Sequence, residues 1–590
     1  MFVRITPDVL KIENTYWYKV SASTKNSEKI VVGSIVRVNI NGRNTKGWVC
    51  EISRSIDELI GAGTITESKI KEVIEYVSDG PPAHIVELCE MLSDYYLVSP
   101  VYFLRASSPK TIVNNLTHQK LEFGDQASEK VILVNPRADR RELISSCIAK
   151  NGSTLIITPD SQMKLSKWLQ SIGNRVVNYG LGEDVTSDIY RKATERSSII
   201  LGGRKSLFAP MSDLKSIIIL DDSYEQLQEE RSPNWNAIDI ARLISDQRSI
   251  SLKIITSVPS SRTEGFQIDD MRSNDELWPL IYVDDKTKKD PALGIFSRQI
   301  LKTIHDSIQN NLNSAIILNN KSAASLLSCQ TCKTIALCEN CGSSVSQHSD
   351  DLEVLHCSKC QSERAMVCLE CKGASFKKMR KGIPSILKEC QKMFPKYSVQ
   401  ELKKTNEGDN NQQAAQPSLY VGTEAILHNR TACESLGSVI FIDFDSLLFR
   451  NSQNSFNQSL VIVNRALRNL KKSDITHPII ISTSVPTNDI IKDLRASDFV
   501  TQTKRDLELR SELALAPYYA TIKIESNTEA IESFSKSIDA RFIVGIEKGE
   551  EKSSLMLRAK NHEELHANCN TQVRSFIARN RCSISVDNYD

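Results

Sequence analysis

Eight of the fifteen cysteines in this 590-residue chain lie in one short stretch. They form four CxxC pairs: Cys329/Cys332, Cys338/Cys341, Cys357/Cys360 and Cys368/Cys371. Each pair can direct two thiolates at one metal ion, and two pairs complete a tetrahedral four-thiolate site. The spacing therefore predicts two zinc ions. Four thiolates per ion leave no open position for water, so these sites would be structural and not catalytic.

A disulfide framework, chance clustering and an iron–sulfur cluster are the alternatives for these cysteines. The N-terminal stretch "MFVRITPDVLKIENTYWYKV" has no basic segment followed by an apolar one, and the sequence has no apolar run of about 18 residues. A reducing cytosol is thus the expected compartment, which favours metal over disulfides. The spacing allows two ways to share the ions. Either each ion is held by two consecutive CxxC pairs, or the first and fourth pairs (the outer pairs) hold one ion and the second and third (the inner pairs) hold the other.

Composition sets limits on partners and size. The formal net charge is +2 and 25% of residues are charged, so no overall basic field indicates nucleic acid, and any DNA-binding surface must be local. The hydrophobic content is 40%, as in ordinary globular domains. At about 100–200 residues per domain, the length predicts about three to five domains.

The first hundred residues predict a β-rich domain. Two alternating stretches within 33–52 flank Asn41-Gly42, which is a strong hairpin signal. A helix is expected after Pro81-Pro82. We expect this N-terminal domain to span 1–104, followed by a polar linker over 105–130.

Short runs of Ile, Leu and Val then alternate with helical segments, a pattern typical of parallel α/β sheets. They fall into two sets, at 131–135, 153–159, 198–203, 216–222 and 252–259, and at 314–320, 418–424, 438–445 and 478–486. We expect one lobe at 131–285 and a second at 286–500, the second carrying the cysteine-rich insertion at 326–375. Residues 501–590 predict a small α+β domain.

Several motifs make the chain resemble one family. They are "LGGRKSLFAPMSDL" (201–214), "SPNWNAIDIA" (232–241), "TSVPS" (256–260), "LNNK" (318–321) before the insertion, and the cysteine octet in this order. "INGR" (40–43) and "DYYLVSP" (94–100) add weaker matches near the N-terminus. Together they resemble primosomal protein N′, the replication-restart PriA family.

The resemblance implies a fold and a metal pairing. The two lobes would be RecA-like parallel-sheet lobes of superfamily 2 helicase type, beside a domain that captures the 3′ end of a nascent strand. The outer cysteine pairs (329, 332, 368, 371) would share one zinc and the inner pairs (338, 341, 357, 360) the other.

The chain departs from that family at the phosphate-binding loop. With Glu142 aligned to the Glu after the family's GVTGSGKT loop, the loop falls on "VNPRADRR" (134–141). A phosphate cradle needs glycines, a Lys and a Ser/Thr hydroxyl. Here Pro136 removes a donor and Asp139 would repel phosphate, so the nucleotide site is predicted to be lost. Arg137, Arg140 and Arg141 could still hold a phosphate by charge.

The other nucleotide motifs are also degenerate. Asp221 and Asp222 stand at the family's DEEH box, with a one-residue uncertainty in alignment, and an exposed turn is the alternative for them. Motif V survives as "VGTEAILHN" (421–429). Arg465 and Arg468 keep the arginine spacing of motif VI, although such arginines are more often solvent-facing.

The function implied by this resemblance is replication restart without unwinding. The chain would recognise stalled or branched forks, with DNA contacts from Arg43, Lys46 and Trp48, although Trp48 could instead be a core residue. An active ATP-dependent 3′-to-5′ helicase is the alternative. A third possibility is a zinc-ribbon protein that contacts only proteins.

The resemblance also implies cofactors, partners and location. We expect two zinc ions and no ATP or magnesium. The partners would be forked or single-stranded DNA, helicase loaders, the replicative helicase and single-strand binding protein. We expect a monomer without a membrane anchor, in the cytoplasm and associated with the nucleoid.

Overall fold

The computed structural model spans the whole chain. The residues that it describes are all except 11–14, 56–69, 117–118, 160–162, 181–183, 273–280, 289, 291–292, 319–326, 341–344, 348–353, 358–361, 379–382, 403–415, 450–454, 472, 497, 550–551 and 588–590. No helix within the described residues is long and apolar enough to cross a membrane.

The N-terminal part is a mostly antiparallel sheet backed by two helices. The strands, in the order β5-β2-β1-β4-β3-β6, are β5 (Lys71–Glu72), β2 (Tyr16–Lys19), β1 (Phe2–Pro7), β4 (Arg43–Ser53), β3 (Ile35–Ile40) and β6 (Glu75–Ser78). The helices are α2 (Ala83–Tyr96) and α3 (Val101–Ser107). The predicted hairpin joins β3 to β4, with positive φ at Asn41 (48°) and Gly42 (81°), as a type I′ turn requires.

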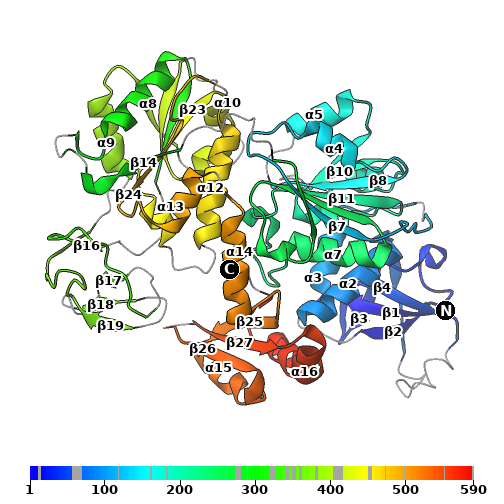
Figure 1. The fold of residues 1–590 in the computed structure, drawn as a ribbon. Helices are drawn as coiled ribbons and strands as arrows, with labels where there is room; N and C mark the ends of the chain where they lie inside the picture. The colour runs from blue at the N-terminus through cyan, green and yellow to red at the C-terminus, as the bar shows by residue number, and fades with distance from the viewer. Residues whose placement is uncertain are drawn as a thin grey trace.

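The first lobe is a seven-stranded parallel sheet flanked by helices (Figure 1). The strands, in order, are β13 (Gln267–Asp270), β7 (Ser128–Leu133), β12 (Ser251–Thr256), β11 (Leu214–Leu220), β8 (Ser153–Ile157), β10 (Ile199–Gly202) and β9 (Val176–Tyr179). The helices are α4 (Arg141–Cys147), α5 (Met163–Ser171), α6 (Ser187–Ala193) and α7 (Ala237–Arg248). The predicted strands are confirmed, whereas β9 and β13 were not predicted.

The second lobe repeats the architecture with six parallel strands. In order they are β14 (Ile281–Asp285), β24 (Ile479–Thr483), β23 (Leu436–Phe441), β15 (Asn313–Ile317), β22 (Ser418–Gly422) and β21 (Ser398–Leu402). The helices are α8 (Arg298–Gln309), α9 (Ile383–Met393), α10 (Arg430–Glu434), α11 (Asp445–Leu448), α12 (Ser455–Asn469) and α13 (Asp489–Arg495). The prediction of two parallel α/β lobes is therefore confirmed.

A small cysteine-rich module is inserted between β15 and α9. It contains one two-stranded sheet, β16 (Leu327–Cys329) with β20 (Phe376–Lys378), and one three-stranded sheet, β17 (Ser346–Gln347), β18 (Val354–His356) and β19 (Glu363–Ala365). The module projects from the second lobe (Figure 1). Residues 319–321 of the "LNNK" motif lie outside the described residues.

The C-terminal part is α+β, as predicted. Helix α14 (Thr501–Glu512) leads into an antiparallel sheet of β26 (Ile543–Glu547), β27 (Lys552–Ala559), β25 (Ala520–Asn527) and β28 (Ser583–Val586). Helices α15 (Thr528–Ser535) and α16 (His562–Arg579) accompany it. The sequence did not predict α16 or β28.

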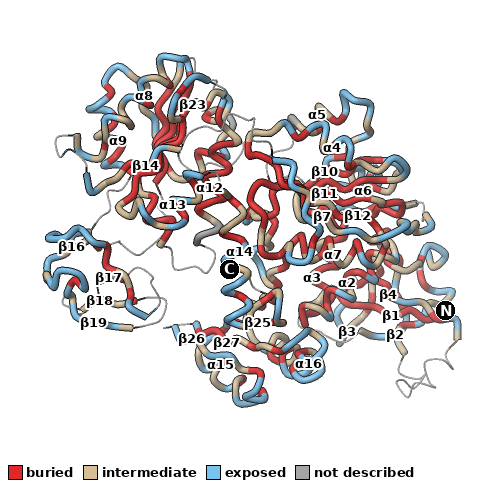
Figure 2. The backbone as a smooth tube through the Cα atoms, in the orientation of Figure 1, coloured by how far each residue is buried: buried red, intermediate tan, exposed pale blue. Residues whose placement is uncertain are grey.

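One hydrophobic cluster runs through the N-terminal part, the first lobe and the C-terminal sheet. It includes Trp48, Leu92, Ile217, Ile522 and Val573. Most of the buried residues of the second lobe instead belong to two other clusters. In Figure 2 the buried residues accordingly concentrate in the centre of each lobe, on either side of a junction. The first three parts thus share one core, and the second lobe joins that body through a separate contact.

Polar contacts reinforce the joint between the N-terminal and C-terminal parts. Arg574 of α16 donates to the carbonyl of Ser93 and to the carboxylate of Asp94, both at 2.9 Å, near the end of α2. The Tyr95 hydroxyl donates to Asp587 at 2.9 Å. Asp94 and Tyr95 of the "DYYLVSP" motif are therefore engaged in contacts with the C-terminal part.

Candidate functional site

The outer cysteine pairs lie in two turns of the same shape. The Cys329 amide donates to the Thr334 carbonyl at 2.9 Å, and the Cys368 amide donates to the Gly373 carbonyl at 2.8 Å. The residues that follow the second cysteines, Lys333 and Lys372, have positive φ of 65° and 59°. In both turns the amide of this lysine donates back to the first cysteine's carbonyl at 3.0 Å. Each six-residue turn thus holds its two thiols on one side.

The two turns bring four sulfur atoms together. The sulfurs of Cys329, Cys332, Cys368 and Cys371 all lie within 4.8 Å of one another, with Cys329 Sγ 3.4 Å from Cys371 Sγ. Tetrahedral zinc, with Zn–S distances of about 2.3 Å, would separate its sulfurs by about 3.8 Å. Hydrogen bonding to Thr334 lowers the pKa of Cys332 to about 6, whereas hydrogen bonding to the other three cysteines raises the pKa of Cys371, so the positions of the sulfurs rather than these pKa values indicate a metal ion. These four thiols therefore fit a metal ion.

The close packing around these sulfurs supports the same fit. A Cβ added to Gly373 would lie 3.4 Å from the Cys371 sulfur and 3.2 Å from the Thr331 hydroxyl. Every cysteine within the described residues is a free thiol. The geometry thus brings the outer pairs together, which is the pairing that the family resemblance implied.

The inner pairs are described only in part, since Cys341 and Cys360 lie outside the described residues. Cys338 and Cys357 are both buried in the small core of the module, beside Leu355. The Cys357 amide donates to the Ser362 carbonyl at 2.9 Å, the same spacing along the chain as in the two outer turns. This hydrogen bond from Cys357 to Ser362 therefore repeats the amide-to-carbonyl contact of the two outer turns.

The expected DNA-contact residues separate into two environments. Arg43 and Lys46 are exposed on β4, but they are three positions apart, so the alternation of a strand directs them to opposite faces of the sheet. Trp48 is only 4% exposed, and its indole donates to the Ser108 hydroxyl at 2.8 Å. The expected stacking role of Trp48 is corrected accordingly: it is a core residue, because its ring packs with the apolar cluster around α2.

The segment that the sequence aligns with a phosphate loop, residues 134–141, makes contacts within the protein. Arg140 is buried at the start of α4, and it donates to Asp221 at 2.9 Å and to Ser257 at 3.0 Å. Arg141 is exposed and pairs with Asp139 at 2.9 Å. Two of the three arginines that could have held a phosphate by charge are therefore paired with carboxylates.

The carboxyl ends of three parallel strands explain how this cluster forms. Residue 134 follows β7, Asp221 follows β11 and Ser257 follows β12, and these strands lie side by side in the order β7-β12-β11. Asp221 has φ of 56°, in the left-handed region, and is 2% exposed. The possibility that Asp221 and Asp222 form an exposed turn is therefore wrong, since both are buried.

Arg465 and Arg468, the arginines with the spacing of motif VI, both reach from α12 of the second lobe to the first lobe. Arg468 forms an ion pair with Asp221. The guanidinium of Arg465 lies 4.1 Å from the ring centre of Tyr224, and it donates to Gln226 at 3.3 Å. Neither arginine is simply solvent-facing, since Arg465 is 7% exposed and Arg468 is held by Asp221.

Asp222 has a different environment from its neighbour. It accepts a hydrogen bond from the Ser260 amide at 2.7 Å, and burial raises the pKa of its carboxyl. A groove of about 380 Å³ adjoins it, and the acidic residues of its lining, Asp222, Glu225, Glu229 and Glu230, outnumber its single arginine, Arg262. Such a lining disfavours the phosphates of a nucleotide.

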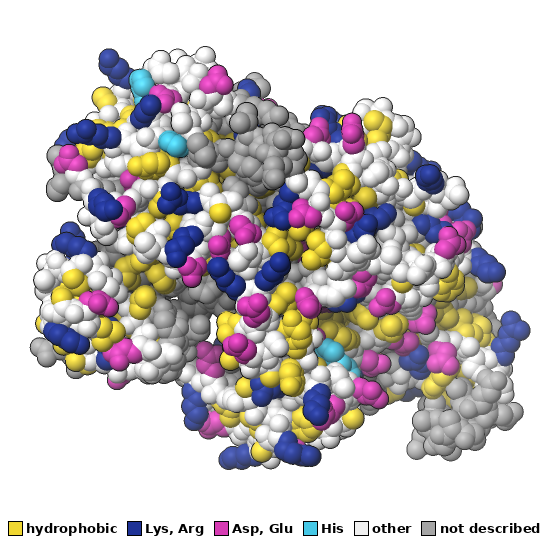
Figure 3. All heavy atoms as spheres, viewed as in Figure 1, with side chains coloured by type: hydrophobic (Ala, Val, Ile, Leu, Met, Phe, Trp, Pro, Cys, Tyr) yellow, Lys and Arg dark blue, Asp and Glu magenta, His cyan; other side chains and the backbone are white. Residues whose placement is uncertain are grey.

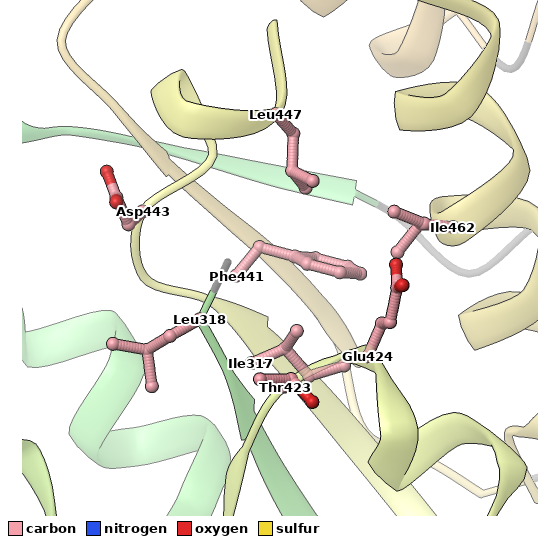
Figure 4. Close-up of a pocket in the computed structure, with 8 residues that line it drawn as sticks. All are labelled: Ile317, Leu318, Thr423, Glu424, Phe441, Asp443, Leu447 and Ile462. Carbon is pink, nitrogen blue, oxygen red and sulfur yellow. The ribbon is translucent and has the colours of Figure 1, made fainter. Parts of the chain in front are cut away.

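A second cavity, in the second lobe, is too small for a nucleotide. Its volume is about 10 Å³, room for about one water molecule. Figure 4 shows the Phe441 ring at its centre, with Leu447 on one side and Ile317 on the other, and Glu424 beside Ile462. This space is a packing defect beside the remnant of motif V.

Charge is dispersed over the surface shown in Figure 3. Basic and acidic side chains are interspersed across that face, in agreement with the net charge of +2.

Three residues that contact Arg140 or Arg465 between the two lobes were not identified from the sequence: Tyr224, Ser257 and His428. Tyr224 lies two residues after Asp222, but no pattern in the sequence shows that its ring packs against the guanidinium of Arg465. His428 falls within the remnant of motif V, and its contact with Arg465 depends on how α12 packs.

The N-terminal part matches a known family model. Residues 5–109 match the model for the PriA 3′DNA-binding domain (3′BD). This match covers the N-terminal sheet together with α2 and α3.

Longer alignments connect the chain to curated proteins named replication restart protein PriA. It is 24% identical over 351 residues to that of Thermotoga maritima, covering 57% of this chain and 47% of the relative. The Bacillus subtilis protein is 20% identical over 406 residues, covering 64% and 50%. The Rickettsia felis protein is 22% identical over 557 residues, covering 84% and 83%. The chain thus spans about half the length of the first two, and the resemblance to PriA is confirmed.

Proposed function

We propose that this chain is a replication-restart protein that recognises stalled or branched DNA forks and recruits replication partners without ATP-driven unwinding. The observation that carries this proposal is the state of the nucleotide cleft. Arg140 and Arg468 both pair with Asp221, where a related motor would have a lysine, an arginine and a carboxylate around a nucleotide. The match of residues 5–109 to a 3′DNA-binding domain supports the recognition of DNA.

The proposed division of labour follows the domains expected from the sequence. Residues 1–104 would bind the DNA 3′ end, 105–130 would be a linker, and 131–285 and 286–500 would be degenerate lobes of superfamily 2 helicase type. The last strand in the range 131–285, β14 (Ile281–Asp285), pairs with β24 and so belongs to the second lobe. The insertion at 326–375 and the C-terminal 501–590 would contact partners. Within the described residues of the linker, helix α3 ends at Ser107 and strand β7 begins at Ser128, and the residues between them form no helix or strand.

The metal centre belongs to the same proposal. The outer four cysteines would hold one zinc ion and the inner four a second. The converged sulfurs of Cys329, Cys332, Cys368 and Cys371 support the first, and the repeated hydrogen bond from the Cys357 amide to the Ser362 carbonyl supports the second. Zinc would stabilise the module, and the module would present a surface to other replication proteins.

The proposed partners are forked or single-stranded DNA, helicase loaders, the replicative helicase and single-strand binding protein. The protein would act as a monomer in the cytoplasm, associated with the nucleoid. Phosphoryl transfer needs backbone donors, a lysine, magnesium ligands and a positioned water. The pairing of Asp221 with two arginines and the absence of a Gly-Lys pair in the sequence support the loss of this chemistry.

Two measurements on the full chain test the proposal. Binding of a fork with a free 3′ end at the branch should be detectable by fluorescence anisotropy, and should weaken when that end carries a phosphate. ATP turnover with and without the fork should equal a buffer blank, and no displaced strand should appear. Turnover that is abolished by both Asp221→Asn and Asp222→Asn would instead establish an active helicase.

Surface variants locate the DNA contact. Arg43→Ala and Lys46→Ala, tested singly, should differ, because the two side chains lie on opposite faces of β4. Replacing the residue on the DNA side should reduce the slope of log affinity against log salt by about 1. Lys71→Ala, on the far edge strand β5 of the same sheet, is the matched control. If the wild type binds no fork and turns over no ATP, the results favour the third alternative, a zinc-ribbon protein that contacts only proteins.

A further inference from the structure

One buried carboxylate is shared by two lobes. Each oxygen of Asp221 takes a guanidinium from a different side: Arg140 of the first lobe and Arg468 of the second. The partners lie 81 and 247 residues from Asp221 in the sequence. The side chains of Asp221 and Arg140 are 2% and 6% exposed, so water screens this attraction little.

The backbone at Asp221 is also specialised. Its φ of 56° lies in the left-handed region, which is unfavourable for a residue with a Cβ. The Asp221 amide continues the ladder to Ile255 at 3.0 Å, so the residue is held at the end of the sheet. The structure tolerates this conformation where the carboxylate meets both arginines.

A second contact lies one helical turn earlier on α12. The Arg465 guanidinium stacks 4.1 Å from the centre of the Tyr224 ring and contacts His428 Nε2 at 2.6 Å. Arginine has only donors, so in this contact the histidine nitrogen is the acceptor. His428 belongs to the second lobe and Tyr224 to the first, so Arg465 joins the two lobes across an apolar ring.

Apolar packing and α14 close the same junction. Tyr224 and Val258 of the first lobe are buried within a hydrophobic cluster made otherwise of second-lobe residues. From α14, Thr503 donates to the Pro259 carbonyl of the first lobe at 2.6 Å, and Arg505 pairs with Asp493 of the second lobe at 2.8 Å. Helix α14 therefore contacts both lobes.

We propose that these contacts form an interlobe clasp, made of Arg140, Asp221, Tyr224, Arg465 and Arg468, which keeps the lobes closed without any nucleotide. The Asp221 carboxylate supplies the negative charge that an anionic ligand between the lobes would otherwise supply. The surface formed jointly by the two lobes is then permanently assembled. This inference concerns the cleft of the proposed function and rests on its claim that nucleotide does not bind there.

The test is the distance between the lobes in the full chain. Dyes attached through unnatural amino acids at the exposed positions Lys150 and Lys302 report closure by single-molecule energy transfer. The wild type should show one closed population, unchanged by magnesium and a non-hydrolysable ATP analogue. Arg468→Gln should raise the open fraction at least roughly tenfold, because the buried Asp221 carboxylate loses its cation from the other lobe.

Two further variants sharpen this measurement. Arg468→Gln should leave the first lobe folded, because the Arg140–Asp221 pair stays in place, and Asp221→Asn should open the lobes further. Arg495→Gln, which changes an exposed arginine of α13 in the second lobe, should behave as the wild type.

Specific outcomes overturn the clasp. If Arg468→Gln and Asp221→Asn keep the wild-type distance, or if the wild type samples open states and closes only with the ATP analogue, the inference is wrong. Failure of the proposed function is a separate result, because it requires ATP turnover or loss of fork binding. Open lobes without turnover would reject the clasp alone.

Discussion

Two regions of the molecule differ in how far apart in the sequence their interacting residues are. They are the cysteine centre (Cys329, Cys332, Cys368 and Cys371) and the interlobe cleft around Asp221, Arg140 and Arg468. In the cysteine centre, two six-residue turns each supply two sulfurs, and Cys332 and Cys371 are exposed. In the cleft, Asp221 meets arginines 81 and 247 residues away, and Asp221 is 2% exposed. We therefore expect the cysteine module to depend on a bound ion for its folding, whereas the contacts of Asp221 are held by the two sheets around them.

The largest expected effect comes from the cysteine centre. Cys368→Ser should remove the outer metal ion and unfold the module between β16 and β20 while the lobes stay folded. Structural zinc contributes an apparent free energy of about 10–16 kcal/mol to small metal domains at pH 7. Metal analysis should show one ion fewer per chain, and hydrogen exchange should rise only in the module. Cys433→Ser, in α10, is the control, and an unchanged metal content in Cys368→Ser would contradict this assignment.

The next largest effect is a difference in stability between variants of two adjacent arginines, Arg140 and Arg141. Arg140→Ala should destabilise the first lobe by about 3–5 kcal/mol, because it leaves the buried Asp221 with one fewer cation. Arg141→Ala should leave stability nearly unchanged, since its pair with Asp139 is exposed to solvent. Hydrogen exchange along β11 measures both. Equal effects would mean that the Arg140 pair contributes no more than a surface ion pair.

A pH titration sharpens the comparison within the cleft. Burial raises the pKa of Asp222 above 3.8, so the folded state holds its proton more tightly than the unfolded state. Its contribution to stability is therefore greatest at low pH and declines as pH rises from about 4 through the raised pKa. Between the two pKa values the free energy of unfolding should fall by up to about 1.4 kcal/mol per pH unit. Asp222→Asn should remove this decline in chemical unfolding experiments.

The matched control has the opposite sign. The Arg141 side chain lowers the pKa of Asp139, so that carboxylate contributes stability above about pH 4, which is lost as pH falls. Asp139→Asn should therefore weaken the protein slightly at neutral pH and match it in acid. A parallel pH dependence for both variants would argue against the burial of Asp222.

The smallest effect concerns the backbone of the cysteine turns. Lys333 has φ of 65°, where glycine is favoured, so Lys333→Gly should tighten metal binding by roughly two- to fivefold, or about 0.5–1 kcal/mol. Competition with a chelator measures the change. Thr331→Gly, in the same turn but without positive φ, should not tighten binding. A looser site in Lys333→Gly would indicate that the lysine side chain has a role.

Much of the fold followed from periodicity. The runs of Ile, Leu and Val in β8 and β11 predicted parallel strands because both faces of such strands are buried. Asn41-Gly42 predicted the hairpin because only a few residues accept positive φ at both positions. Helix α16 was not predicted, although Asn561 caps its start, because much of its surface is polar and its docking on the sheet decides its burial.

Local spacing also determined the outer cysteine turns, because a CxxC turn and its ligands are neighbours in the chain. The sequence left the pairing of turns open, and only the folded module brings Cys329 and Cys332 to Cys368 and Cys371. The sequence left Trp48 open between a DNA-stacking surface and the core, and packing against α2 places it in the core. The alternation of a strand determines which side chains share a face of the sheet. It does not determine which face a helix such as α2 packs against.

The interlobe cleft also shows the difference between what local sequence predicts and what only the folded chain decides. The residues of "VNPRADRR" were enough to predict that the phosphate loop had lost its glycines, lysine and hydroxyl. That Asp221 takes Arg140 and Arg468, and that Tyr224 lies under Arg465, depended on two sheets meeting at the ends of their strands. The predicted loss of nucleotide chemistry rests on local residue types, whereas the contacts of Asp221 and Arg465 are long-range and exist only in the folded chain.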